Sequence, residues 1–539
     1  MSLNVLEGVA RTRLEAQLPD LLKAQRWFGG KARDVASVQI IDRIVIPAAR
    51  PGTVLLIVVV AYRDGGHEHY ALPVAAAFGR EAEHIVHEMP RAVLTHLAAG
   101  DTARHEAGVV YDAMWNADAM HRLLDAIGEG ARWPGEAGVL QGSSTAAYAS
   151  MVPSGGHLTA HVLQTQQSNT SVAFGEQALL KLYRRVQAGI NPDWEIGRYL
   201  TSRGFTHSPA AGGVIEYVGP DGTMTVALLQ AFVPNVGDAW HAMLRMLEGF
   251  LARVQQDTAQ VDSEAGRECP LWELVQSALS DAGRTFIGPA LEAAACLGRR
   301  TAALHLTLGA ERSDPNFAAE ALTPAYLEAR QRSMRQSWKE VMQLLTQRSQ
   351  PGAPLRAEAH ELLAQEGHVL AVFQTLLDVR DGGERIRCHG DYHLGQVLWT
   401  GDDYVVTDFE GEPARPLHER RLKHSPLYDV AGMLRSFAYV SSSVLAGQPY
   451  ERRQQLARWT SYWSRWVRAH FLGAYVADVR DAPFWPRSSK DAARLLTVHE
   501  LEKAVYELGY ELNNRPDWAT IPLKGIAEII HMSGVRAAA

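Results

Sequence analysis

Two carboxylates and one amide lie close together in the chain where short apolar stretches alternate with turns. The segment CHGDYHLGQVL places Asp391 directly after a glycine, and Gln396 follows five residues later. The next segment, YVVTDFEGEP, places Asp408 after a strand-like run. A hairpin-like path would bring the three together, with one carboxylate able to accept a proton and two oxygen donors able to bind a hard cation. Phosphoryl transfer needs such a set, because Mg²⁺ must neutralise the nucleotide phosphates while a base orients the acceptor hydroxyl.

The nucleotide phosphates also need a cation, which the preceding half of the chain offers. Lys181 lies late in the strand-like stretch ALLKLYR, and Glu195 follows on the next predicted helix, where it could pair with the lysine. The turn QSNTSVAFG at 167–175 is predicted to cover the phosphates. In place of the usual glycines it offers the hydroxyl and amide donors of Ser168, Asn169 and Thr170.

Each of these residues also has a purely structural interpretation. Asp391 and Asp408, taken singly, are typical of turns, and Glu195 is typical of the acidic first turn of a helix. Lys181 alone is equally well explained as a charge at a strand end. His389 is expected to brace its loop through a backbone hydrogen bond more readily than to transfer a proton. The ordered set as a whole favours a kinase.

Composition and charge narrow the class of protein. A chain of 539 residues favours two or three structural units. The net charge of -7 argues against general affinity for nucleic acid or anionic lipid and favours a small-molecule partner. The three cysteines have no paired metal spacing and form no disulfide framework. The N-terminus lacks a signal-peptide core, and the longest apolar run, 54–61, is far below the ~20 residues that span a bilayer. We therefore expect a cytoplasmic protein with no membrane partner.

Residue periodicity predicts a β-rich first half and a helical second half. Alternating strand and turn signals predict an antiparallel sheet beside an N-terminal helix, with strands at 37–46, 53–62 and 67–76. Further strands are predicted at 157–166, 170–175, 177–184, 212–219 and 223–233. A helix should begin at Pro192, capped by Asn191. Helical spacing dominates beyond residue 237, at 239–256, 289–308, 324–347, 356–377 and from 427 onward.

The chain resembles a known family along nearly its whole length. The segments that carry the likeness are RWFGGKAR (26–33), QSNTSVAFG (167–175), LLKLYRRVQAGINPDWEIGRYL (179–200), LLQAFVPNVGDAW (228–240), HGDYHLGQVL (389–398), DFEGEPARPLHERRLKHSPLYDVAGMLRSF (408–437) and KAVYELGYELNNRPDW (503–518). They are similar to the bacterial maltokinases, within the aminoglycoside phosphotransferase and protein-kinase-like superfamily. The likeness is greatest to the maltokinase region that is often fused behind trehalose synthase.

This resemblance implies an α+β fold with the two lobes of a protein kinase. A β-rich N-lobe and a helical C-lobe are expected, with an additional N-terminal cap subdomain. The implied boundaries are 1–105 for the cap, 106–235 for the N-lobe with an intermediate segment, and 236–539 for the C-lobe.

The resemblance also implies a role for each matching residue. Asp391 would be the catalytic base, and Gln396 and Asp408 would bind Mg²⁺. The residues implied to bind ATP are Lys181, Glu195, Ser168, Asn169, Thr170, Gln230 and Phe232, the last two at the hinge that reads adenine. The residues expected at the sugar are His389, Glu410, Lys503, Tyr506, Glu507 and Arg515. For the C-terminal members of this set, a solvated helix face with an inward-packed tyrosine is an equal alternative.

The activity implied by the resemblance is ATP-dependent phosphorylation of maltose at its anomeric hydroxyl. The product, maltose 1-phosphate, would feed α-glucan and glycogen synthesis, with trehalose as the upstream source and a trehalose synthase as a candidate partner. One alternative is a kinase for glucose, glucosamine or another amino sugar, and an acid-rich sugar pocket would favour an amino sugar. The other alternative is a non-catalytic, kinase-like partner of trehalose synthase.

Overall fold

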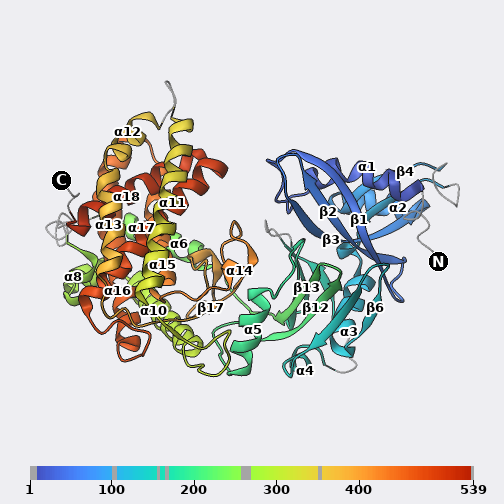
Figure 1. Ribbon diagram of the computed structural model, residues 1–539, viewed down its shortest axis with the longest axis horizontal. Coiled ribbons are helices and arrows are strands. Elements are labelled where there is room, and N and C mark those ends of the chain that lie inside the picture. Colours follow the sequence, from blue (N-terminus) through green and yellow to red (C-terminus); the bar gives the residue numbers. More distant parts are fainter. Residues whose placement is uncertain are drawn as a thin grey trace. The chain divides into compact units, whose positions relative to one another are not determined.

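The chain is divided into two compact units. The computed structural model describes residues 9–99, 106–153, 158–163, 169–256, 269–349 and 355–535. The first unit comprises Met1–Pro234 and Pro416–His418, and the second comprises Asn235–Arg415 and Glu419–Ala539. In Figure 1 the first unit carries most of the strands and the second most of the helices. The β-then-helical order expected from the sequence is confirmed.

The first sheet of the first unit contains the three antiparallel strands expected at its start. Its order is β1 (Val35–Ile46), β2 (Thr53–Tyr62), β3 (His67–Phe78), β5 (Gly108–Asp112) and β4 (Val93–Leu97), and β11 (Arg185–Val186) pairs with β3. The uninterrupted apolar run of β2 is explained by burial on both faces. Val54, Leu56 and Val58 pack in one core cluster, whereas Leu55 and Ile57 pack in another, as the two-residue period of a strand requires.

Helix α1 (Val9–Ala24) supplies its apolar stripe to the first of these clusters. Leu14, Leu18 and Leu22 recur every four residues and are all buried there. That spacing places them on one face of the helix. The N-terminal helix expected from the sequence is therefore confirmed, and it is packed beside the sheet through this stripe.

The second sheet contains Lys181 and the strand that follows the turn predicted to cover the phosphates. Its order is β6 (Arg132–Pro134), β7 (Val139–Ser144), β12 (Ala211–Gly219), β13 (Gly222–Ala231), β10 (Ala178–Leu182), β9 (Thr170–Phe174) and β8 (Ala160–Val162). The strand expected at 157–166 is present only as β8, and 164–168 lie outside the described residues. Helices α2 (Gly79–Glu88), α3 (Ala117–Glu129), α4 (Tyr148–Met151) and α5 (Pro192–Ser202) complete the unit. As expected, Asn191 caps α5 by accepting from the amide of Asp193.

The second unit is a helical assembly with two small β-ribbons. Its long helices are α6 (Ala239–Val254), α10 (Pro289–Leu308), α11 (Pro324–Arg348), α15 (Leu427–Ala446), α16 (Tyr450–Val479), α17 (Ser489–Asn514) and α18 (Thr520–Ser533). The shorter helices are α8 (Leu271–Gln276), α9 (Asp281–Ile287), α12 (Arg356–Ala364) and α13 (Glu366–Gln374). The short helix α14 (Leu417–Arg420) has residues in both units. The ribbons pair β14 (Glu320–Ala321) with β15 (Glu384–Arg385) and β16 (Val397–Trp399) with β17 (Tyr404–Val406).

One predicted helix is divided in the structure. The stretch 356–377 forms α12 and α13, which are separated at Gln365, and then a short 3₁₀ turn at Thr375–Asp378. Gly367 is the second residue after the break, and glycine has a low propensity for the helix interior. Across the described ranges, none of the helices combines the length and the apolarity that crossing a bilayer would require.

Candidate functional site

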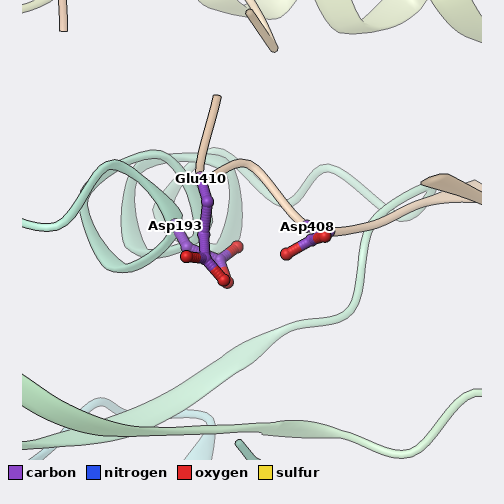
Figure 2. Close-up of side chains that lie close together, drawn as sticks. All are labelled: Asp193, Asp408 and Glu410. Atoms are coloured by element: carbon purple, nitrogen blue, oxygen red, sulfur yellow. The ribbon is translucent and has the colours of Figure 1, made fainter. Parts of the chain in front are cut away.

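The β16–β17 hairpin places Gln396 and Asp408 at its open end. Val397 pairs with Val406, so the two predicted metal ligands flank the first rung of the ribbon. The carbonyl of Gln396 accepts from the amide of Thr407 at 2.9 Å, which fixes the register beside Asp408. Asp408 has a φ of 67°, in the left-handed region that Asp enters more readily than most residues. Figure 2 shows Asp408 and Glu410 on the loop that leaves the hairpin.

The loop that carries Asp391 is anchored by a buried carboxylate. Asp429, in the first turn of α15, is 1% exposed. It accepts from the amide of His389 at 2.7 Å and from the amide of Gly390 at 3.0 Å. His305 contacts the same carboxylate at 3.1 Å. Burial alone would raise the pKa of Asp429, but the hydrogen bond and charge of His305 and the Gly390 amide bond hold it below its ordinary value.

His389 braces the loop that carries Asp391 through both ring nitrogens. Its Nδ1 accepts from the amide of Asp391 at 3.4 Å, so its Nε2 carries the proton and donates to the carbonyl of Thr407 at 2.9 Å. The ring packs against Tyr392 and Phe409, with centroid separations of 5.2 and 5.0 Å. The bracing role expected from the sequence is confirmed. The contact of His389 with a sugar stays a prediction.

Asp391 forms a charge network with Lys503 of helix α17 and with Glu412. Lys503 Nζ lies 3.0 Å from Asp391 Oδ1 and 2.9 Å from Glu412 Oε1. Burial would raise the pKa of Asp391, yet the charge and hydrogen bond of Lys503 lower it to about 2. Burial opposes the charged form of Lys503, but Glu412 and Asp391 raise its pKa well above the ordinary value. Asp391 and Lys503 are therefore both ionised at neutral pH.

Three of the predicted sugar-binding residues share one face of α17. Lys503, Tyr506 and Glu507 are spaced i, i+3 and i+4, and Lys503 Nζ lies 4.7 Å from the Tyr506 ring centroid. Glu507 Oε2 lies 2.8 Å from an Nη of Arg435. This face is joined to Asp391 through Lys503. The helix thus positions a charged and aromatic set beside the proposed base.

Arg515 and Glu410 lie in different surroundings from that set. Arg515 ends α17, pairs with Glu511 at 2.8 Å and stacks over Trp518 with its guanidinium 4.8 Å from the ring centroid. Glu410 is half-buried on the loop after the hairpin. Arg420 donates from Nη2 to the carbonyl of Pro413 at 2.9 Å, further along that loop, and so holds it in shape. Sugar contacts of Arg515 and Glu410 stay predictions.

In the first unit, Lys181 is held by an acid other than the one predicted. Its Nζ lies 2.9 Å from Asp193 Oδ2, and the hydroxyl of Tyr183 donates to the same oxygen at 2.8 Å. Asp193 lies in the first turn of α5 (Figure 2). Glu195, one residue beyond Trp194, is buried on the same helix. The pairing of Lys181 with Glu195 stays a prediction, and the sequence did not single out Asp193 as a partner of the lysine.

The other predicted nucleotide contacts are distributed along the second sheet. Ser168 lies outside the described residues, and Asn169 is half-buried just before β9. Thr170 begins β9, and its hydroxyl accepts from Arg184 Nε at 2.8 Å. Gln230 pairs with Leu179 near the end of β13.

The residues after β13 lead toward the boundary between the units. The amide of Phe232 donates to the carbonyl of Gln177 at 3.0 Å. Phe232 lies two residues before Pro234, which is the last residue of this part of the first unit. That is the position in the chain where the sequence predicts a hinge.

Sequence reasoning did not identify the anchoring role of Asp429 or the way Lys503 and Glu412 surround Asp391. A signal for Asp429 was present, since LYDVAGML places a single acid in an otherwise apolar helix start. A buried acid of that kind must have polar partners. Which amides it bonds depends on the fold and not on the local sequence.

Comparisons with known proteins support this architecture. Residues 21–115 match the family described as the maltokinase N-terminal cap domain. A glucosamine kinase of Mycolicibacterium smegmatis is 28% identical over 363 residues, which cover 67% of this chain and 77% of the relative. A glucosamine kinase of Streptacidiphilus jiangxiensis is 25% identical over 370 residues, which cover 68% of this chain and 72% of the relative.

Solved structures of low identity share the fold. A glucosamine kinase in complex with glucosamine, ADP and inorganic phosphate has a TM-score of 0.57 at 20% identity, over 95% of this chain and 98% of that chain. A second crystal form of glucosamine kinase gives 0.58 at 19% identity, over 95% and 99% of the two chains. The chain therefore has the α+β fold of these kinases, and its residues 21–115 match the maltokinase N-terminal cap domain, as the resemblance implied.

Proposed function

We propose that this chain is a sugar kinase that transfers the γ-phosphoryl group of ATP to a sugar hydroxyl. The observation that carries the proposal is an ionised Asp391 on a loop anchored by Asp429, in the same unit as the oxygen donors of Gln396 and Asp408. The glucosamine kinase relatives support the reaction class, and a glucosamine kinase of the same fold that was solved with ADP supports the use of ATP.

In the proposed reaction Asp391 orients the acceptor hydroxyl. The hydroxyl oxygen bonds to the γ-phosphorus, the bond from that phosphorus to the bridging oxygen of ADP breaks, and the hydroxyl proton passes to Asp391. A pKa of about 2 makes Asp391 a weak base, which suits a loose transition state in which proton transfer is late and positioning dominates. The carboxylate oxygens of Asp408 and the amide oxygen of Gln396 fit Mg²⁺ and would hold it. When bound, the ion would neutralise phosphate charge.

The first unit is proposed to hold the nucleotide. Lys181 is a nearly buried cation, steadied by Asp193 and Tyr183, and is proposed to contact the phosphates. The further residues proposed at ATP are Glu195, Ser168, Asn169, Thr170, Gln230 and Phe232. Because Thr170 accepts a hydrogen bond from Arg184, its hydroxyl proton remains available as a donor.

We propose maltose as the acceptor, because the carboxylates around Lys503 are already neutralised by cations. Glu412 is paired with Lys503 and Arg415, and Glu507 is paired with Arg435. An ammonium-bearing sugar would have to displace one of these cations, whereas a neutral disaccharide would not. The aromatic rings of this region suit the apolar faces of sugar rings. The residues proposed at the sugar are His389, Glu410, Lys503, Tyr506, Glu507 and Arg515.

The match to the maltokinase cap domain supports the same acceptor. Its product would be maltose 1-phosphate, a substrate for α-glucan synthesis. A trehalose synthase is then the proposed upstream partner, since maltose must be supplied.

Glucosamine is the second candidate acceptor. The curated relatives and the solved structures with the same fold are glucosamine kinases. The two curated relatives are 28% and 25% identical to this chain over about two thirds of its length.

The acceptor is tested by measuring kcat/KM with ATP and Mg²⁺ on maltose, glucosamine, glucose and trehalose. We expect turnover on maltose to exceed turnover on the other three sugars by at least tenfold. A preference for glucosamine would show that glucosamine and not maltose is the acceptor, and the proposed mechanism would still hold. Absence of turnover together with absence of ATP binding would favour the non-catalytic role.

A further inference from the structure

Residues of α15, α16 and α18 in the second unit line a basic pocket. Its volume is about 310 Å³, large enough for a small organic ligand. Five cationic side chains line it: Arg435, Arg453, Arg465, Arg468 and Lys524. Among the lining residues that the structure describes, the only carboxylate is Glu528. The surplus of positive charge suits an anion.

The wall of the pocket also carries buried hydroxyls. Ser441 is 6% exposed, and within the described ranges its Oγ has no hydrogen-bond partner. Arg468 Nε is likewise without a partner there, although its Nη2 pairs with Glu500. Both residues belong to the lining of the pocket, so its wall is polar as well as cationic.

Arg435 connects this pocket to the proposed sugar-binding face. It donates from Nε and Nη2 to Glu507 Oε2, at 3.0 and 2.8 Å. Glu507 lies one helical turn after Lys503, which contacts Asp391. Asp391 is not among the described residues that line the pocket. Arg435 therefore links a ligand in the pocket to Glu507 of the proposed sugar-binding face.

We propose that this pocket binds a small phosphate ester of sugar size, apart from the reactive site, and that the bound phosphate draws Arg435 away from Glu507. Guanidinium groups bind phosphate oxygens in pairs of parallel hydrogen bonds. The serine and threonine hydroxyls of the wall, such as Ser441 and Thr460, suit the hydroxyls of a sugar. Loss of the Arg435 bonds would loosen Glu507 and weaken acceptor binding. Binding itself does not depend on the proposed kinase reaction, whereas the effect on the acceptor does.

Calorimetric titration of the full chain tests the binding. The probes are glucose 1-phosphate, inorganic phosphate and glucose. The pocket variant combines Arg453→Glu with Lys524→Glu, both at exposed positions. The control combines Arg452→Glu with Arg480→Glu, which are exposed, lie outside the pocket lining and change the net charge equally.

We expect the wild type and the control to show a glucose 1-phosphate site that the pocket variant loses or binds at least tenfold more weakly. Equal binding by all three proteins, or no binding by the wild type, would overturn the proposal. If inorganic phosphate binds as tightly as glucose 1-phosphate, the pocket is a site for free phosphate. The claim that it recognises a sugar would then be overturned.

Acceptor kinetics test the link through Arg435. With saturating glucose 1-phosphate, the acceptor KM of the wild type should rise several-fold, and that of the pocket variant should rise less. Product-like competition at the reactive site would raise KM equally in both proteins. That equality, with binding to the pocket established, would refute the coupling and keep the binding site. Failure of the kinase activity itself would leave the calorimetric result as the test of the pocket.

Discussion

Replacing Lys503 by Met should move the acid limb of the pH–rate profile to higher pH. Lys503 lies 3.0 Å from Asp391 and 2.9 Å from Glu412, and its charge has the largest effect of those that lower the pKa of Asp391. In the wild type this pKa is about 2. Asp391 is therefore ionised throughout the pH range in which the enzyme can be assayed, and its titration should not limit the rate there.

The size of the change follows from the removed charge. Without Lys503, the pKa of Asp391 should return at least to the ordinary aspartate value of about 4. Burial of Asp391 and the nearby Glu412 carboxylate would both raise it further. A rise of about 2 pH units corresponds to about 3 kcal/mol. Since protonated Asp391 cannot accept the hydroxyl proton, activity should fall as the pH drops from about 6 to about 4.

The assay is kcat/KM for the acceptor between pH 4 and 9, measured by chromatographic quantification of ADP so that no coupling enzyme limits the rate. Lys503→Arg keeps the charge and should retain the wild-type acid limb. Lys490→Met removes an exposed lysine of the same helix and should change nothing. An acid limb in Lys503→Met that coincides with the wild-type limb would refute the charge argument.

Stability provides a check on the same variant. Breaking a buried ion network by removing one partner costs about 3–5 kcal/mol, so Lys503→Met should unfold at lower urea concentration. Glu412 keeps Arg415 as a partner, whereas Asp391 loses its nearest cation, so the double variant Lys503→Met with Asp391→Asn should recover part of that loss. Because Asp391 has a lowered pKa in the folded state, its contribution to stability is present above pH 4 and is lost as the pH falls toward 2.

Three further perturbations separate the parts of the site. Asp429→Asn should lower kcat at least tenfold and the free energy of unfolding by about 2–4 kcal/mol, because it weakens the anchor of the Asp391 loop. Steady-state kinetics measure the first change and urea unfolding the second. An unchanged kcat would contradict the anchoring role. Lys181→Met should raise the KM for ATP at least tenfold with the sugar KM unchanged, and an effect confined to the sugar would contradict its assignment. Glu507→Gln should raise the sugar KM with the ATP KM unchanged, and equal effects on both would indicate a structural role.

Local patterns predicted much of the fold because local forces determine those parts. The apolar run of β2, the Asn191 cap of α5 and the turn between β16 and β17 each form where the sequence indicates them. The hairpin also explains why Gln396 and Asp408 could be grouped before the structure was known: a short antiparallel ribbon brings residues at its two ends together.

The parts that could not be predicted depend on long-range packing. Asp429 binds amides about forty residues away in the chain, and Lys503 contacts Asp391 across 112 residues. Neither pairing leaves a periodic signal in the sequence. The order of the second sheet, in which β13 lies between β12 and β10, likewise depends on the whole unit. The basic pocket has the same origin, since α15, α16 and α18 each contribute only part of its lining.

The most direct test of the central claim is phosphorus NMR of a reaction containing the protein, ATP, Mg²⁺ and maltose, with Asp391→Asn in parallel. We expect the wild type to convert ATP to ADP with an equal amount of a sugar phosphate whose phosphorus couples to the anomeric proton. Asp391→Asn should yield no sugar phosphate while binding ATP with wild-type affinity. A variant that forms the product at nearly the wild-type rate, or a wild type that phosphorylates no sugar, would contradict the account.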